Sequence, residues 1–150
     1  MVELVMSKES LYIAHLEKLL TCLKNAKLAY FKASDHAVAA DKKRYFNQQA
    51  LHRNRFFQQV LQELNCLGMT AEDLVINRFN FDQLLIASIE TLKAPAIEKC
   101  IHADQASLEV YHQLRKNQAE NLNLEKQIQL TEEAVKQNKE WITSLALRVS

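Results

Sequence analysis

The scarcity of glycine and proline is the feature that most constrains the fold of this chain. Only Gly68 and Pro95 occur in 150 residues, where average usage predicts roughly ten glycines and seven prolines. Tight turns and phosphate-binding loops need glycine, because it reaches positive φ without strain. One glycine cannot supply a G-x-G-x-x-G or Walker loop, nor the frequent turns of a β-sandwich or barrel. The chain is therefore predicted to consist of long helices joined by few turns.

The charge balance argues against a nucleic-acid partner. The chain carries 19 Lys and Arg against 18 Asp and Glu, a formal net charge of +1, whereas proteins that bind nucleic acid gather basic residues on one face. The densest basic run, Lys42 to Arg44, is expected to be a solvated helix start.

We expect no membrane association and a cytoplasmic location. Unbroken apolar runs such as 84–87 are far shorter than the ~20 residues that span a bilayer. The segment Met1 to Ser10 contains charged residues and lacks the apolar stretch of a signal peptide.

The three cysteines are far apart and form no C-x-x-C pair, so free, buried thiols are expected; they are Cys22, Cys66 and Cys100.

Four segments place apolar residues at alternating spacings of three and four, the pattern of a helix with one buried face. The predicted helices are 4–39, 42–67, 95–119 and 123–148, and the predicted crossover, 68–94, contains a short helix.

The helix ends are predicted from residues with capping chemistry. The carboxylate of Asp41 is predicted to cap the second helix, and Gly68 to close it in the left-handed conformation. The other predicted ends are Thr70 as the cap of a further helix, Pro95 in the first turn of the third long helix, and Asn121 or Asn123 as the cap of the fourth.

The predicted fold class is an all-α, single-domain four-helix bundle over residues 1–150. Two antiparallel hairpins joined by one long crossover are the connectivity of ferritin-like bundles. A plain up-down bundle with a decorated loop is the alternative. The crossover is more apolar than a loop requires, so it either caps the bundle or meets another chain; its apolar residues include Val75, Ile76, Phe79 and Phe81.

Several polar residues occupy positions on the apolar stripes. Because a buried charge needs a partner, we expect Arg53 and Asp104, both near mid-helix, to form a buried pair. Tyr30 and Tyr111 are included in this site as the tyrosines whose hydroxyls would join the pair. The alternative leaves both charged residues half-exposed at the edge of the stripe. The remaining polar positions are Arg115, Thr131 and Asn138.

A ferritin-type metal site is not expected. Such a site needs a Glu from each of two helices and a Glu-x-x-His from each of the other two, but the only Glu-x-x-His runs from Glu109 to His112. The second helix places Gln49, a neutral amide, three residues before His52, and the fourth helix has no histidine. If a metal does bind, the candidate ligands are His52, Asp104, Glu109 and His112.

The order and spacing of these residues resemble a bacterial ferritin-like family of unknown function. The similarity begins with Leu16-Glu17-Lys18-Leu19-Leu20 and continues through Tyr30, Phe46 and the segment from Arg53 to Leu64. The third helix adds Cys100-Ile101-His102-Ala103-Asp104, in which the acid is followed seven residues later by Tyr111. Tyr30 and Tyr111 look like remnants of an internal duplication.

This resemblance implies a four-helix bundle with a crossover, often associated into dimers or larger assemblies, and a link to stress responses in some members. The metal ligand set of ferritins is degraded in this chain, which leaves Asp104 as the acid at a ligand-like inward position. By analogy, Arg53 with Asp104 replaces an ion-bridged core by an ion pair.

The incomplete ligand sets favour a non-catalytic bundle that acts through its surfaces, as a homo-oligomer or an adaptor. This interpretation requires no cofactor and no catalytic residue, and it leaves the protein partner unspecified. The alternative is a metal-binding, ferritin-like oxidoreductase or iron-handling protein with a non-standard site. A third interpretation is a bundle that binds a lipid or small apolar ligand, whereas core packing explains the same aromatic residues: Phe56, Phe57, Phe79, Phe81 and Trp141.

Overall fold

A computed structural model describes residues 8–74, 95–116 and 124–149 as four long helices and one short 3-10 turn, and it places no strand in this part of the chain. The all-α prediction is therefore confirmed. The elements are α1 (Lys8–His36), α2 (Ala40–Cys66), the 3-10 turn η2 (Ala71–Asp73), α5 (Ala96–Lys116) and α6 (Leu124–Val149).

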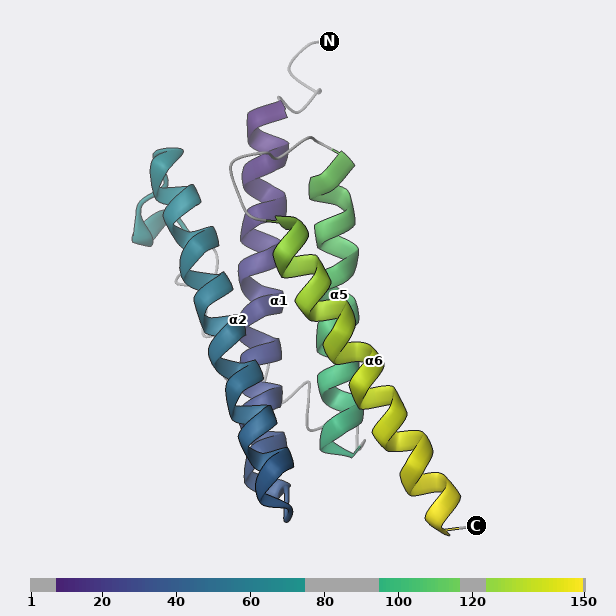
Figure 1. The fold of residues 1–150 in the computed structure, drawn as a ribbon. Coiled ribbons are helices and arrows are strands. Elements are labelled where there is room, and N and C mark those ends of the chain that lie inside the picture. The colour runs from purple at the N-terminus through teal and green to yellow at the C-terminus, as the bar shows by residue number, and fades with distance from the viewer. Residues whose placement is uncertain (1–7, 75–94, 117–123, 150) are drawn as a thin grey trace.

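The four helices form a bundle in which α1 packs against both α2 and α5, and α6 packs against α5. Figure 1 shows that α1 and α6 run in one direction and that α2 and α5 run in the other. The predicted short helix of the crossover, its apolar residues and the predicted cap at Asn121 or Asn123 lie outside the described residues.

The end of α2 follows from the single glycine. Gly68 has a φ of 89°, and its N–H donates to the carbonyl of Asn65 while the N–H of Met69 donates to the carbonyl of Leu64. These two bonds make a Schellman motif, which satisfies carbonyls that the helix end would otherwise leave unpaired. Met69 packs against the core cluster that contains Leu64, so the motif also turns the chain back onto the bundle.

The start of α2 differs from the prediction. The residue that precedes its first turn is Ala39, whose side chain makes no capping hydrogen bond. Asp41 lies in the first turn of the helix instead, where its negative charge is favourable next to the positive end of the helix dipole. Thr70 is followed by only one 3-10 turn, in which the carboxylate of Asp73 accepts from the Thr70 N–H and hydroxyl at 3.1 and 2.8 Å.

Pro95 directly precedes α5, and its carbonyl accepts a hydrogen bond from the N–H of Lys99. Pro95 therefore caps this helix from the position before its first turn, one residue earlier than the first-turn place predicted from the sequence. At the other end of α5, Arg115 lies in the last turn and pairs with Glu125 of α6 at 2.9 Å. Both side chains of this pair are exposed, so it contributes little stability, about 0–1 kcal/mol.

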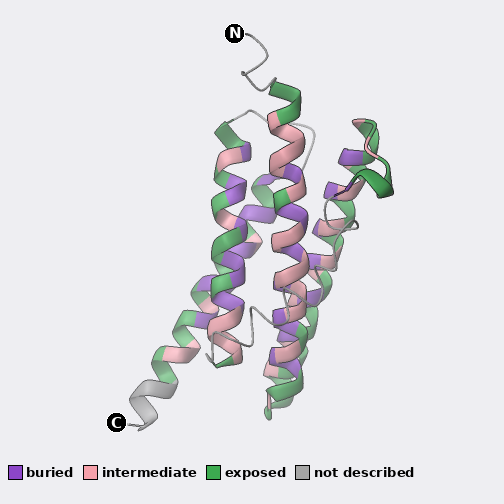
Figure 2. Ribbon diagram, turned by 180° about the vertical axis from the view of Figure 1, so that it is seen from behind, coloured by how far each residue is buried: buried purple, intermediate pink, exposed green. Residues whose placement is uncertain are grey.

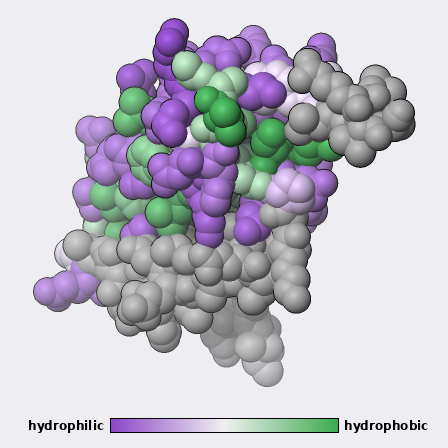
Figure 3. Space-filling view, turned by 90° about the horizontal axis from the view of Figure 1, so that it is seen from below, coloured by the Kyte–Doolittle hydropathy of each residue, from purple (hydrophilic) through white to green (hydrophobic). Residues whose placement is uncertain are grey.

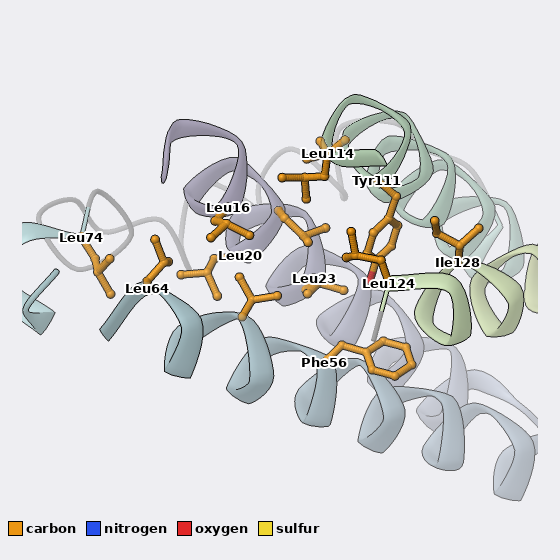
Figure 4. Packing of buried hydrophobic residues seen from close by; sticks show 13 residues of the cluster. Leu16, Leu20, Leu23, Phe56, Leu64, Leu74, Tyr111, Leu114, Leu124 and Ile128 are labelled. Carbon is orange, nitrogen blue, oxygen red and sulfur yellow. The ribbon is translucent and has the colours of Figure 1, made fainter. Parts of the chain in front are cut away.

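The buried faces of the helices meet in two clusters. Figure 2 shows buried residues along the inward faces and exposed residues on the outward ones. The first cluster is rich in leucine, and its labelled members point toward one another in Figure 4. The second consists largely of alanine, together with Tyr30, Phe46 and Cys100. Small side chains in this second cluster leave room for large polar ones at the same level, since protein interiors are close-packed.

No helix in the described part of the chain has both the length and the apolar character needed to cross a membrane.

Candidate functional site

Polar side chains from all four helices meet inside the bundle. This polar cluster consists of Tyr30 from α1, Gln49 and Arg53 from α2, Asp104 from α5 and Asn138 from α6. Arg53 is 1% exposed, and Tyr30, Asp104 and Asn138 are fully buried. Each of these residues lies on the apolar stripe of its own helix, so the packing of the helices brings all of them inside.

The centre of the polar cluster is a bidentate ion pair between Arg53 and Asp104. The guanidinium Nε donates to Oδ1 at 3.2 Å, and Nη2 donates to Oδ2 at 2.9 Å. The third nitrogen, Nη1, donates to the side-chain oxygen of Gln49 at 2.5 Å and to its backbone carbonyl at 3.3 Å. The planar fork of arginine matches a carboxylate in this geometry, and all three guanidinium nitrogens have acceptors.

Tyr30 connects the ion pair to the fourth helix. Its hydroxyl donates to Oδ2 of Asp104 at 2.5 Å and accepts from Nδ2 of Asn138 at 2.9 Å. The guanidinium carbon of Arg53 also lies 4.5 Å from the centre of the Tyr30 ring, a cation–π contact. Asp104 thus accepts three hydrogen bonds from described residues, which occupy both of its oxygens.

Burial and charge act together on the ionisable groups of the polar cluster. Burial raises the pKa of Tyr30 well above its ordinary value, and the neighbouring charge of Asp104 adds to this effect. Burial also raises the pKa of Asp104, against the opposing influence of Arg53 and Tyr30. For Arg53, burial lowers the pKa, but the charge of Asp104 outweighs it and the net change is upward. The guanidinium therefore stays charged inside the bundle and requires the carboxylate as its counter-ion.

The structure brings together three of the four residues in the sequence hypothesis. Arg53, Asp104 and Tyr30 are in contact, whereas Tyr111 belongs to a separate hydrogen-bonded chain. The Tyr111 hydroxyl donates to Oε1 of Gln127 at 2.7 Å, and Nε2 of Gln127 donates to Oε1 of Gln59 at 2.9 Å. The inclusion of Tyr111 in the buried pair was wrong, because its hydroxyl finds a neutral amide on α6 instead.

Sequence reasoning missed two members of the polar cluster. Gln49 lies one helical turn before Arg53, a spacing at which side chains on a helix interact. Asn138 was visible as a polar residue on an apolar stripe, but nothing in the pattern connected it to Tyr30. Its Oδ1 has no hydrogen-bond partner among the described residues.

The other polar stripe positions have local explanations. The hydroxyl of Thr131 donates to the carbonyl of Gln127 at 2.7 Å, one turn earlier in the same helix. Arg115 is exposed and pairs with Glu125, so its predicted place on the buried face was wrong.

Of the three cysteines, Cys100 is buried, Cys22 is half-buried and Cys66 is exposed, which corrects the expectation of three buried thiols.

The four candidate metal ligands do not converge. Both oxygens of Asp104 accept hydrogen bonds within the polar cluster. His52 is half-buried on the side of α2 that faces α6. Glu109 and His112 are exposed on α5. Over the described ranges, no three His, Cys, Asp or Glu side chains are arranged to hold a metal ion.

The aromatic residues proposed for an apolar ligand serve in packing where the structure describes them. Phe56 is a member of the leucine-rich cluster, and Phe57 packs against it. Trp141 makes edge-on contacts with Tyr45 and Phe46, at ring-centre distances of 5.0 and 5.7 Å. Phe79 and Phe81 lie outside the described residues.

Comparison with known proteins finds no matching family model, no similar curated protein and no similar solved structure.

Proposed function

We propose that this chain is a ferritin-like bundle without catalytic activity, which acts through its surface by associating with further copies of itself. The observation that supports this proposal most strongly is the state of Asp104. It is the acid at the ligand-like position in the bundle, and its carboxylate already accepts three hydrogen bonds from Arg53 and Tyr30.

The residues present do not fit a ferritin-type metal centre. Carboxylates bind a metal ion with the same oxygens that here face a guanidinium, and the fixed positive charge of Arg53 would repel a cation at this position. The potential ligands Glu109 and His112 are exposed on a different face of α5 from the buried Asp104. The interior of the bundle is therefore structural, and the surface is left to carry the function.

The end of the bundle where α1 connects to α2 offers an apolar surface for self-association. Val38 is 100% exposed and Phe31, near the end of α1, is 39% exposed. Ala39 in the connection and Ala40 at the start of α2 are exposed as well. We call these four residues the end patch. Figure 3 looks at this end and shows hydrophobic residues interspersed among hydrophilic ones. Burial between two copies would remove this apolar surface from water.

Sedimentation velocity over a wide concentration range tests the proposal. The wild-type chain should form a dimer or larger assembly, and Phe31→Ser with Val38→Ser should shift the equilibrium toward the monomer. Leu51→Ser is the matched control, because Leu51 is an exposed apolar residue at 60% on the middle of α2. A wild-type chain that is monomeric at every concentration, or equal effects of both variants, would contradict the role of the end patch.

Metal titration followed by native mass spectrometry tests the absence of a metal centre separately. The proposal predicts no stoichiometric uptake of iron, manganese or zinc by the wild-type chain. Uptake of two metal ions per chain that is lost in Glu109→Gln or His112→Gln would favour the oxidoreductase or iron-handling alternative.

A further inference from the structure

A cavity of about 210 Å³ lies between α2 and α6, and none of the described residues that line it belongs to the polar cluster or to the end patch. One face of α2 supplies residues spaced three and four apart, and the first two turns of α6 supply the rest. The lining residues are His52, Arg55, Phe56 and Gln59 from α2, and Lys126, Gln127 and Leu130 from α6.

Among the described residues that line this cavity, the charged side chains all have the same sign. Arg55 and Lys126 approach it from opposite helices, and His52 adds a third group that can carry a positive charge. No carboxylate is among the lining residues that the structure describes. Neither Arg55 nor Lys126 forms an ion pair with any residue that the structure describes.

The positive charge around the cavity affects the pKa of the His52 imidazole. Burial lowers the pKa of His52 from 6.5, and the charges of Arg53, Arg55 and Lys126 lower it further. The cavity also lies against the N-terminal turns of α6, where the helix dipole adds a partial positive charge. An anion in the cavity would relieve this accumulation of positive charge.

The remaining walls define what kind of anion fits. The ring of Phe56, which stacks on His52 at a centre distance of 6.4 Å, and the side chain of Leu130 provide apolar surface. Gln127 and Gln59 provide amides, joined by a hydrogen bond of 2.9 Å. At about 30 Å³ for each water molecule, the volume corresponds to about seven waters, which suits one phosphate group with a short organic substituent.

We propose that the cavity between α2 and α6 is a binding site for a small phosphate-bearing molecule, held by Arg55, Lys126 and His52. The guanidinium of Arg55 donates two parallel hydrogen bonds to the phosphate oxygens, and Lys126 contributes a point charge from the opposite helix. The apolar wall of Phe56 and Leu130 contacts the organic substituent. The ligand bridges α2 to α6, two helices that otherwise meet through long side chains.

An NMR titration of the His52 imidazole tests this assignment. Inorganic phosphate and glycerol 3-phosphate are the two probes, added at constant ionic strength with chloride as the balancing anion. The His52 signal, assigned by its loss in His52→Asn, should shift with a saturable dependence on the probe, and the pKa of His52 should rise because a bound anion stabilises the imidazolium. Tighter binding of glycerol 3-phosphate would identify an organic phosphate as the ligand, and tighter binding of inorganic phosphate would identify free phosphate.

The double variant Arg55→Gln with Lys126→Gln should weaken binding by roughly tenfold or more, because it removes both charge-assisted contacts. Both side chains are exposed, so circular dichroism should show an unchanged fold. The matched control is Lys43→Gln with Arg44→Gln, which changes the net charge equally at exposed positions outside the cavity. A shift that never saturates, or equal affinity in the two double variants, would overturn the proposal.

Discussion

Asp104 is the residue on which the interior of this molecule depends. It is fully buried, and its oxygens receive hydrogen bonds from a guanidinium and a tyrosine hydroxyl on two other helices. Taking such a pair out of water is costly, and apolar residues of similar volume often stabilise a fold equally well. Neither Arg53 nor Asp104 can be removed alone without a large loss of stability, because removal of either residue leaves the charge of the other buried without a counter-charge.

The hydroxyls of the two buried tyrosines, Tyr30 and Tyr111, should contribute differently to the free energy of unfolding. Tyr30→Phe removes a hydrogen bond to a charged carboxylate and the acceptor of the Asn138 amide, so we expect a loss of about 1.5–3 kcal/mol in the free energy of unfolding. Tyr111→Phe removes a hydrogen bond to a neutral amide, for which about 1 kcal/mol is expected. Urea denaturation of both variants measures the difference, and an equal or larger loss in Tyr111→Phe would contradict this assignment of roles.

Stability should fall in alkaline solution, because buried acids keep protons that the unfolded chain releases. Burial is the largest cause that raises the pKa of Cys22 from 9.0 to about 11, and it likewise raises those of Tyr12 and Tyr45 from 10.0 to about 12. Where the folded state binds more protons than the unfolded state, the free energy of unfolding decreases as pH rises. The decrease should therefore begin near pH 9 and continue toward pH 12.

Urea denaturation at a series of pH values measures this decrease. The variant Tyr12→Phe with Tyr45→Phe should have a shallower slope above pH 10, because it lacks two of the groups that titrate there. A slope identical to that of the wild-type chain would show that these tyrosines do not contribute to it.

At the residue level, the sequence predicts which charges must find partners but not which neutral groups join them. Arg53 and Asp104 are charges on apolar stripes, so their pairing follows from the cost of burial. Tyr30 reaches Asp104 from α1, whereas Tyr111 lies two turns from Asp104 on α5 itself and meets Gln127 of α6. Which tyrosine joins the ion pair depends on how far the neighbouring helices are displaced along α5. That displacement is set by the packing of the whole bundle, and helical periodicity carries no information about it.

At the level of the helices, C-terminal signals are more predictable than N-terminal ones in this chain. Gly68 ends α2 because a left-handed residue closes a helix locally, through bonds within a few residues. The start of α2 depends instead on where the chain leaves α1, so the helix begins one residue before Asp41 and leaves its carboxylate in the first turn.

Gly68→Ala should lower the free energy of unfolding by about 1 kcal/mol. A Cβ at this position meets no other atom within 4 Å, so the cost comes from the positive φ of 89° alone. Gly68→Asn should cost less, because asparagine tolerates the left-handed conformation better than alanine. Thermal and urea denaturation of the two variants check this order, and a cost in Asn equal to or above that in Ala would contradict the explanation.

At the level of the whole molecule, the apolar stripes predict an all-α bundle, and the scarcity of glycine and proline predicts its few turns. The stripes do not reveal that α2 and α6 are bridged by large side chains, such as Trp141 against Tyr45 and Gln127 against Gln59. They also do not reveal the cavity between these helices, since His52, Arg55 and Lys126 come from helices with no recognisable common motif. These features arise only when the four helices are packed together.

An ion pair, and not a ligand site, occupies the centre of the polar cluster inside the bundle. A double-mutant cycle on Arg53→Met and Asp104→Leu, measured by urea denaturation, tests it most directly. Each single variant should lose about 3–5 kcal/mol, because it leaves one charge buried without a partner. The double variant should lose far less than the sum of the two, which gives a large coupling energy. Losses that simply add would show that the two residues act independently and would contradict the account.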